Sequence, residues 1–246
     1  MNPETMRNVL LVVPHADDEV IGCGGIIQAL VDRNANVYVI CITGEDDRSV
    51  AKPVYINGEN LRVAESLKVR RFLGYKQIEH LNIPERSFAQ DISVWKEIKE
   101  TLQRRMTLKN IDTIFIPNHF DMNPDHRTVY DICIDAINEH VVKQVANLKE
   151  IYLYEVWGPT QATHYYLLSQ KQYYYKLHAM RLYKTQMETV DYCKIIEEIN
   201  NSRNISCSES LQNHKKRLEE NKEFFERIDV KNISNCLTFK ANKHVC

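Results

Sequence analysis

The sequence has little of what marks the simpler classes of protein. Glycine and proline occur only seven times each in 246 residues, which argues against a collagen-like, linker-rich or many-turned all-β chain. The 32 basic and 33 acidic side chains nearly cancel, so no general basic surface attracts nucleic acid or an anionic membrane. Hydrophobic residues make up 43% and charged residues 26%, a composition that excludes intrinsic disorder and is typical of a globular protein.

Long apolar stretches are also missing. No stretch approaches the roughly 20 residues that span a bilayer, and residues 1–8 lack the hydrophobic region of a signal peptide. We therefore expect a soluble, cytoplasmic protein with no integral membrane segment and no nucleic-acid partner. The seven cysteines are scattered and form no C-x-x-C pair, so we expect reduced thiols rather than a disulfide framework or a structural zinc knuckle.

Short apolar runs alternate with longer helical patterns through most of the chain. Strands are predicted over residues 9–14, 36–43, 77–81, 112–117 and 150–156. Helices are predicted over residues 19–33, 58–73, 91–108 and 125–145, with Gly74 as a C′ residue and Asp91 as an N-cap. This alternation predicts an α/β fold, a Rossmann-like, open and mostly parallel sheet flanked by helices.

The last part of the chain has a different pattern. Residues 171–187, 188–200 and 207–228 are predicted helices, and residues 233–239 a short strand. We expect one domain over residues 1–246, with a core over about 8–187 and a helical C-terminal extension over about 188–246.

Ionisable side chains crowd the loop after the first predicted strand, in residues 14–19 (PHADDE). Ligands bind at the carboxyl ends of the strands in open α/β sheets. A solvated helix cap would explain a single acid there, but Asp17, Asp18 and Glu19 repel one another, and a divalent cation would relieve that repulsion. The glycines that follow fail the G-x-G-x-x-G spacing, and the acids would repel a phosphate, so dinucleotide binding is disfavoured.

A second polar loop, residues 117–127 (PNHFDMNPDHR), follows the fourth predicted strand. The first and fourth strands are neighbours in the common doubly wound order, so the two loops should face each other. His15, Asp18 and His126 would then form a set of three ligands that leaves a position open, the pattern of catalytic zinc. Asp17, beside a ligand but free to point at that position, is the candidate general base. A cap or a solvated surface residue is the alternative for each histidine taken alone.

The two motifs PHADDE and NPDHR resemble those of the LmbE-like, or PIG-L-like, zinc-dependent de-N-acetylases. Further similarities lie in residues 62–65, 73–74, 154–159 and 176–186, so the resemblance covers roughly residues 8–187. It implies an enzyme that removes acetyl groups from N-acetylglucosaminyl compounds. It also implies metal ligands at His15, Asp18 and His126, a base at Asp17, an ordering acid at Asp125 and a substrate-binding arginine at Arg62.

The sequence departs from the family pattern at two positions. Ala16 stands where proline is usual, and Asn123 stands where many members have a histidine. An asparagine amide can donate a hydrogen bond to an oxyanion but cannot change protonation at neutral pH, so Asp17 would have to both accept and return the proton. Glu155 and Trp157, at the end of the fifth predicted strand, are candidates for substrate binding, with Trp157 as the candidate for the substrate wall.

Several alternatives stay open at this point. The same site would serve an amidase that cleaves a larger sugar–thiol conjugate, and a non-catalytic sugar-binding relative would share the fold. A nucleotide-binding α/β protein is the third class. Zn²⁺ is the expected metal, with another divalent ion such as Fe²⁺ as the alternative. The substrate is expected to be a small amino-sugar derivative of undetermined identity, and a homo-oligomer stays open.

Overall fold

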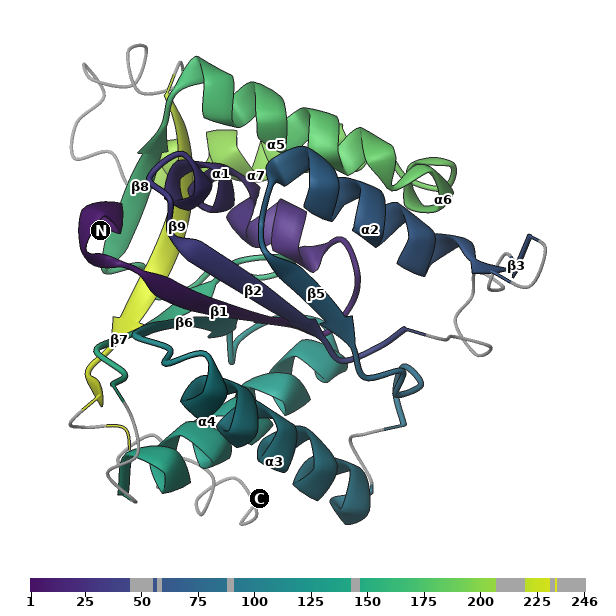
Figure 1. The fold of residues 1–246 in the computed structure, drawn as a ribbon. Coiled ribbons are helices and arrows are strands. Elements are labelled where there is room, and N and C mark those ends of the chain that lie inside the picture. Colours follow the sequence, from purple (N-terminus) through teal and green to yellow (C-terminus); the bar gives the residue numbers. More distant parts are fainter. Residues whose placement is uncertain are drawn as a thin grey trace, which may run out of the picture.

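The computed structural model describes residues 1–44, 55–56, 59–87, 91–142, 147–206, 220–230 and 233. Its centre is a seven-stranded sheet with the order β5-β2-β1-β6-β7-β9-β8 (Figure 1). Neighbouring strands from β5 to β7 are parallel, and β9 pairs antiparallel with both β7 and β8. The strands are β1 (Asn8–Val13), β2 (Asn36–Cys41), β5 (Gln77–His80), β6 (Thr113–Pro117), β7 (Glu150–Tyr154), β8 (His164–Leu168) and β9 (Asn221–Ile228). Two short strands, β3 (Tyr55–Ile56) and β4 (Glu59–Asn60), form a separate pair.

Helices cover both faces of the sheet (Figure 1). One face carries α1 (Asp18–Val31), α2 (Leu61–Leu73), α5 (Gln170–Leu182), the short α6 (Lys184–Met187) and α7 (Tyr192–Ser206). The other face carries α3 (Ile92–Leu108) and α4 (Pro124–Val142). A 3₁₀ turn over Pro3–Thr5 precedes β1. The predicted α/β class, an open and mostly parallel sheet flanked by helices, is confirmed.

The predicted elements of the first half match the structure closely. The apolar run of β1 is buried from Val9 to Val13, because helices cover both faces of that strand. The helix α2 ends where Gly74 adopts a left-handed φ of 80°, and the Asp91 side chain accepts from the Ser93 N–H at the start of α3. β1 and β6, the first and fourth predicted strands, are hydrogen-bonded neighbours. The switch point therefore lies where the two polar loops leave the sheet.

The prediction of a helix over residues 207–228 is wrong for its last part. Residues 221–228 form β9, which lies between β7 and β8 inside the sheet. β8 was not predicted as a strand, and the helix expected over 171–187 is divided into α5 and α6. The strand predicted over residues 233–239 lies, apart from its first residue, outside the described residues. The extension is therefore partly helix and partly sheet.

β9 ties the late part of the chain to α1 through a buried carboxylate. Both oxygens of Glu223 accept at 2.8 Å, one from the Gly25 N–H and the other from the Ile26 N–H. The Lys176 ammonium lies 2.6 Å from the same carboxylate, and both side chains are at most 5% exposed. A buried charge persists only when it is paired and hydrogen-bonded, and this one is.

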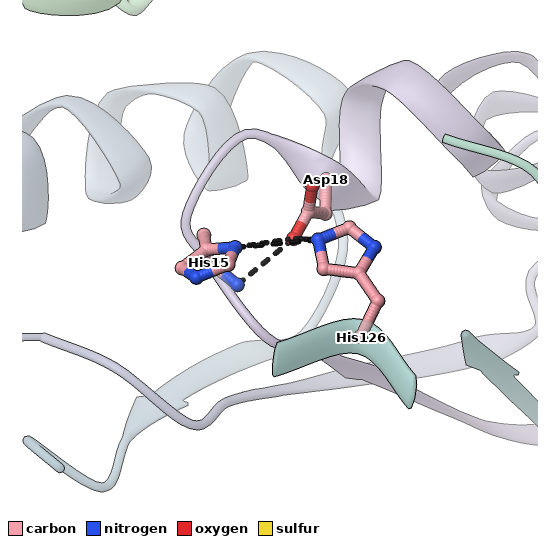
Figure 2. Close-up of side chains that lie close together, drawn as sticks. All are labelled: His15, Asp18 and His126. Carbon is pink, nitrogen blue, oxygen red and sulfur yellow. Dashed lines mark hydrogen bonds and ion pairs between the residues drawn. The ribbon is translucent and has the colours of Figure 1, made fainter. Parts of the chain in front are cut away.

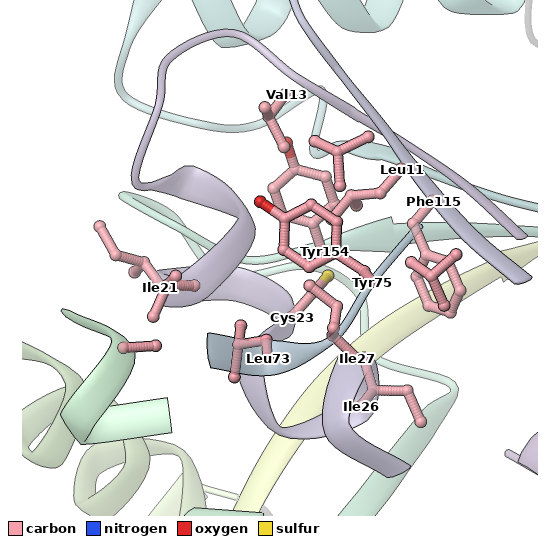
Figure 3. Packing of buried hydrophobic residues seen from close by; sticks show 14 of the residues in the cluster. Leu11, Val13, Ile21, Cys23, Ile26, Ile27, Leu73, Tyr75, Phe115 and Tyr154 are labelled. Carbon is pink, nitrogen blue, oxygen red and sulfur yellow. The ribbon is translucent and has the colours of Figure 1, made fainter. Parts of the chain in front are cut away.

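The helix α1 packs unusually close to the sheet. A Cβ on Gly22 would lie 2.4 Å from Cδ2 of Tyr154, a distance that no side chain tolerates. Figure 3 shows this side of the core, where Ile26 and Ile27 of α1 pack with residues of the sheet such as Leu11. None of the helices in the described part of the chain has the length and apolar character that a membrane crossing needs.

Candidate metal centre and active site

The two polar loops meet at the carboxyl edge of the sheet. β1 ends at Val13 and β6 at Pro117, and the helices α1 and α4 begin just beyond them. His15, Asp17 and Asp18 follow β1, while His126 lies in the first turn of α4. All four residues are at most 6% exposed. The juxtaposition expected from the strand order is therefore present.

Three atoms of this cluster form a nearly regular triangle (Figure 2). Nε2 of His126 lies 3.3 Å from Nδ1 of His15 and 3.2 Å from Oδ2 of Asp18, and the remaining side, Nδ1 of His15 to Oδ2 of Asp18, is 3.3 Å. Ligand atoms about 2.0–2.1 Å from a tetrahedral zinc ion are about 3.3–3.4 Å apart. The triangle thus fits three corners of a tetrahedral metal site, and the donor set is one that zinc accepts.

The electrostatics of the cluster favour a bound cation. Burial alone lowers the pKa of His15, but hydrogen bonds to Asp125 and Asp18 outweigh it and raise the pKa to about 9. Burial likewise lowers the pKa of His126, and the charges of Asp18 and Asp121 with their hydrogen bonds raise it to about 10. Positive charge is therefore stabilised on both rings, and a divalent ion would supply that charge in place of the protons.

A carboxylate lies behind each histidine of the triangle. Oδ2 of Asp125 is 3.3 Å from Nε2 of His15, and Oδ2 of Asp121 is 3.3 Å from Nδ1 of His126. Such carboxylates fix the ring orientation and tautomer of a metal-binding histidine and make it a stronger ligand. The expectation that Asp125 orders the site agrees with this geometry. Asp121, which was not singled out from the sequence, has the equivalent position behind His126.

Asp17 occupies a strained and buried position beside the triangle. Its φ of 124° lies in the region that favours glycine, and its carboxylate makes no capping bond to α1. Burial raises the pKa of Asp17 more than the nearby Arg62 charge lowers it, and the Asp18 charge adds to the increase, which places the pKa at about 7. A carboxylate with a pKa near neutrality is suited to accept and return a proton.

Arg62 joins Asp17 to a second acid. Its Nη2 lies 3.3 Å from Oδ2 of Asp17, its Nη1 lies 3.0 Å from Oε1 of Glu85, and its Nε donates to the Ala16 carbonyl. The guanidinium therefore forms part of the wall of the site, and the Arg62 side chain is 23% exposed. Glu85, in the loop after β5, was not found from the sequence because nothing near it suggests a site.

The cluster opens into a cavity of about 840 Å³, within the range of small-molecule sites. His15, Asp17 and Asp18 line it on one side and Asn123 and Asp125 on another. Trp157 and Tyr192, whose rings meet edge to face at 5.9 Å, form part of its wall. The cavity therefore combines a metal-binding corner with an aromatic wall.

The remaining residues predicted for the site divide between the cavity and its surroundings. Asn123 uses Oδ1 to accept from the Asp125 N–H, which leaves its amide NH₂ facing no partner within the described ranges. Trp157 lines the cavity, and its backbone N–H donates to Asp121. The structure does not bring Glu155 to the cavity, because its carboxylate is held by Thr160 and Arg203.

The pattern of one family matches just over half of the sequence. It is the PIG-L family, described as GlcNAc-PI de-N-acetylase, and it matches residues 10–137, the segment that holds both polar loops. The chain belongs to the PIG-L family. This match confirms the resemblance drawn from the two motifs.

A curated relative is similar to about half of this PIG-L chain. The probable N-acetyl-alpha-D-glucosaminyl L-malate deacetylase 2 of Bacillus cereus is 28% identical over 137 residues, which are 54% of this chain and 61% of that protein. The chain thus spans about three fifths of the length of this relative.

Solved structures extend the likeness of fold to nearly the whole chain. The N,N'-diacetylchitobiose deacetylase of Pyrococcus horikoshii covers 93% of this chain and 86% of its own, with a TM-score of 0.68 and 21% identity. The 4-carboxy-2-hydroxymuconate hydratase of Pseudomonas putida covers 91% of this chain and 96% of its own, with a TM-score of 0.65 and 15% identity. At these identities the likeness concerns the fold alone, and the two proteins are named for different reactions.

Proposed function

We propose that this PIG-L protein is a metal-dependent hydrolase that removes the acetyl group from an N-acetylated amino sugar or its conjugate. The triangle of His15, Asp18 and His126, with Asp17 beside it on the wall of one cavity, carries the proposal. The family membership and the deacetylase names of two similar proteins support it.

His15, Asp18 and His126 would hold the metal, and Zn²⁺ is the ion we propose because two imidazoles and a carboxylate at this spacing suit it. A zinc ion in such a site polarises a carbonyl oxygen and lowers the pKa of water. Asp125 and Asp121 keep the two rings in the orientation that ligation needs.

The protein's own residues provide proton transfer and charge stabilisation. Asp17 accepts a proton from the attacking water and returns it to the departing amine, since no histidine stands at position 123. The free NH₂ of Asn123 donates to the oxygen on which negative charge develops. Arg62 is bound to Asp17 and Glu85, so its main role in this proposal is to orient the Asp17 carboxylate rather than to bind substrate.

The aromatic wall supports a sugar as the substrate. Trp157 and Tyr192 offer ring surface next to polar groups, a combination that suits the apolar face of a hexose ring and its hydroxyls. A cavity of about 840 Å³ admits an amino sugar with a further substituent. We therefore expect activity on a substituted N-acetylglucosamine.

The decisive experiment joins elemental analysis of the purified protein to acetate release from a panel of N-acetyl amino sugars, free, disaccharide, nucleotide-linked and lipid-linked. We expect about one divalent ion per chain and acetate from at least one compound. A metal-loaded protein that releases no acetate from any of them would contradict the proposal. Release of a larger acid instead of acetate would identify an amidase that uses the same site.

The neighbour named as a hydratase gives a second arm to this experiment. The same panel is supplemented with an unsaturated dicarboxylic acid, and the loss of its ultraviolet absorbance is followed. We expect no change, because five acidic side chains line the cavity against two arginines, and one of these, Arg62, is already paired with Asp17 and Glu85, so a dicarboxylate meets net negative charge. Hydration of the acid without acetate release would favour the hydratase instead.

A further inference from the structure

Glu19 and Tyr183 form a buried pair directly behind Asp17, and the chemistry proposed above uses neither of them. Both side chains are 0% exposed. The Tyr183 hydroxyl donates to Oε1 of Glu19, and the Asp17 N–H donates to Oε2 of Glu19 at 3.0 Å. The Glu19 carboxylate therefore links the residue proposed as base to the hydroxyl of Tyr183, which is 164 positions from Glu19 in the sequence.

The Asp17 N–H donates to Glu19 while the Asp17 backbone is in a strained conformation. A non-glycine residue with a φ of 124° is maintained only when its surroundings over-determine it. The carboxylate of Asp17 does not cap α1, and it lies 3.3 Å from Nη2 of Arg62 instead. The Asp17 N–H bonded to Glu19 and the Ala16 carbonyl bonded to Nε of Arg62 hold the two ends of the peptide before Asp17, while the Asp17 carboxylate lines the cavity beside Nη2 of Arg62.

Tyr183 is fixed from its own side as well. It lies between α5 and α6, and its carbonyl accepts from the Gln186 and Met187 N–H groups. The next turn is held by Glu65 of α2, which accepts from the N–H and the hydroxyl of Thr185. The hydroxyl that contacts Glu19 therefore has a rigid support, part of which lines the cavity.

We propose that Glu19 and Tyr183 are positioning residues that hold the strained backbone of Asp17 and so aim its carboxylate at the reacting amide. The inference rests on the proposed function, because it takes Asp17 as the base. It predicts that removal of one buried hydroxyl, far from any substrate, slows the chemical step.

The test compares Tyr183→Phe with two other buried tyrosines of the same apolar cluster. The Tyr75 hydroxyl has no partner within the described part of the chain, whereas the Tyr154 hydroxyl donates to the Val12 carbonyl at 3.0 Å. Figure 3 labels both controls in the core. Y75F removes a hydroxyl without a bond, and Y154F removes a hydroxyl whose bond has no connection to Asp17.

Each variant is assayed on the N-acetyl sugar that the wild type hydrolyses fastest, with metal content and Tm measured on the same preparation. Y183F is expected to lower kcat at least tenfold with KM within twofold and metal content unchanged. Y75F should match the wild type in all respects. Y154F should lower Tm and leave kcat within twofold.

Substitutions at Glu19 give an independent reading. E19Q keeps an oxygen for the Asp17 N–H and an NH₂ that can donate to the Tyr183 oxygen, so it should retain most of kcat. E19A removes both contacts and should lower kcat at least as far as Y183F. Equal losses in E19Q and E19A would contradict a role through these two hydrogen bonds.

A crystal structure of Y183F provides a measure that needs no activity. We expect the φ of Asp17 to leave the positive region or its carboxylate to turn away from the cavity. An unchanged Asp17, or a kcat that falls no further than in Y154F, overturns the positioning role. A wild type that hydrolyses no compound of the panel contradicts the proposed function instead, and the Asp17 geometry in Y183F then decides the inference.

Discussion

The two loops that build the site hold their residues in different ways. The loop after β1 is enclosed by helices, and its acids Asp17, Asp18 and Glu19 are at most 4% exposed. The loop after β6 is held mainly by short-range turns, such as the Asn123 N–H donating to Asp121, and it presents Met122 to solvent at 78% exposure. The first loop is buried throughout, whereas the second alternates buried residues such as Asp121 and His126 with exposed ones such as Met122.

The two loops also contribute different groups to the candidate site. The first loop supplies two of the three candidate metal ligands and the candidate base, whereas the second supplies one ligand, His126, and the carboxylates behind both histidines. The atoms proposed to act on the substrate thus lie mostly in the rigid loop. The groups that orient them, and the edge of the cavity that a substrate passes, lie mostly in the second loop.

The largest effect is expected from His126→Ala, which removes the second loop's only member of the triangle. Two ligands cannot replace three, so both metal and activity should fall to background. Elemental analysis and the acetate assay check this. His119→Ala in the same loop is the matched control, since that ring packs on Phe120 and Tyr130 rather than in the triangle. Full metal content in H126A would remove His126 from the ligand set.

Asp17→Asn should separate catalysis from metal binding in the first loop. Loss of a general base typically costs about 10²–10⁴-fold in rate, and the triangle of ligand atoms does not include Asp17. We expect kcat to fall by about that factor with unchanged metal content. Turnover equal to that of the wild type would contradict the role of Asp17.

The orienting carboxylates should give intermediate effects. Removing a carboxylate behind a metal-binding histidine costs about 10–100-fold in metal affinity or activity. Asp121→Asn should be more harmful than Asp125→Asn, because Asp121 also accepts from two backbone N–H groups, those of Trp157 and Asn123, whereas Asp125 also accepts from one, that of Arg86. Competition with a fluorescent zinc chelator measures both affinities. The reverse order would show that the turn around Asp121 does not depend on its charge.

Metal removal should affect stability moderately. A ligand present at 100 times its Kd stabilises the folded state by about 2.7 kcal/mol, which for a chain of this size corresponds to a fall in Tm of roughly 5–10 °C when the metal is removed. Thermal unfolding with and without chelator measures the shift. H126A should show none, because it has no bound metal to lose.

The smallest effect is expected from Met122→Ser at the exposed edge of the cavity. Exposed substitutions away from special features change stability by less than about 0.5 kcal/mol, and Met122 is 78% exposed. Because Met122 lines the cavity, the substitution should instead alter the relative rates of hydrolysis of different N-acetyl sugars. A large loss of stability would show that Met122 contributes to the packing of the second loop in spite of its exposure.

The residues of the candidate site that could be predicted from the sequence are those that lie next to predicted strands. His15, Asp17, Asp18 and His126 follow two apolar runs, and the strand order of α/β folds brings the ends of those runs together. Glu85, Tyr183 and the position of Asp121 behind His126 depend on how distant helices and loops pack. No local pattern encodes those contacts.

β9 shows why the end of the fold was not predicted. Its sequence NKEFFERI is rich in charged residues of high helix propensity, and one of these residues, Glu223, is buried. Glu223 points inward to Lys176 and to the amides of α1. A buried ion pair formed with a distant helix overrides local propensity, and a single sequence gives no sign of it.

The place of β9 in the sheet has a consequence for the order in which the molecule assembles. β8 precedes β9 along the chain but lies beyond it at the edge, so β8 has no strand to pair with until residues 221–228 have been synthesised. Until then Lys176 lacks its counter-ion and the Gly25 and Ile26 amides lack their acceptor. The two loops that carry the candidate metal ligands thus emerge from the ribosome well before β9, the strand that completes the sheet beside them.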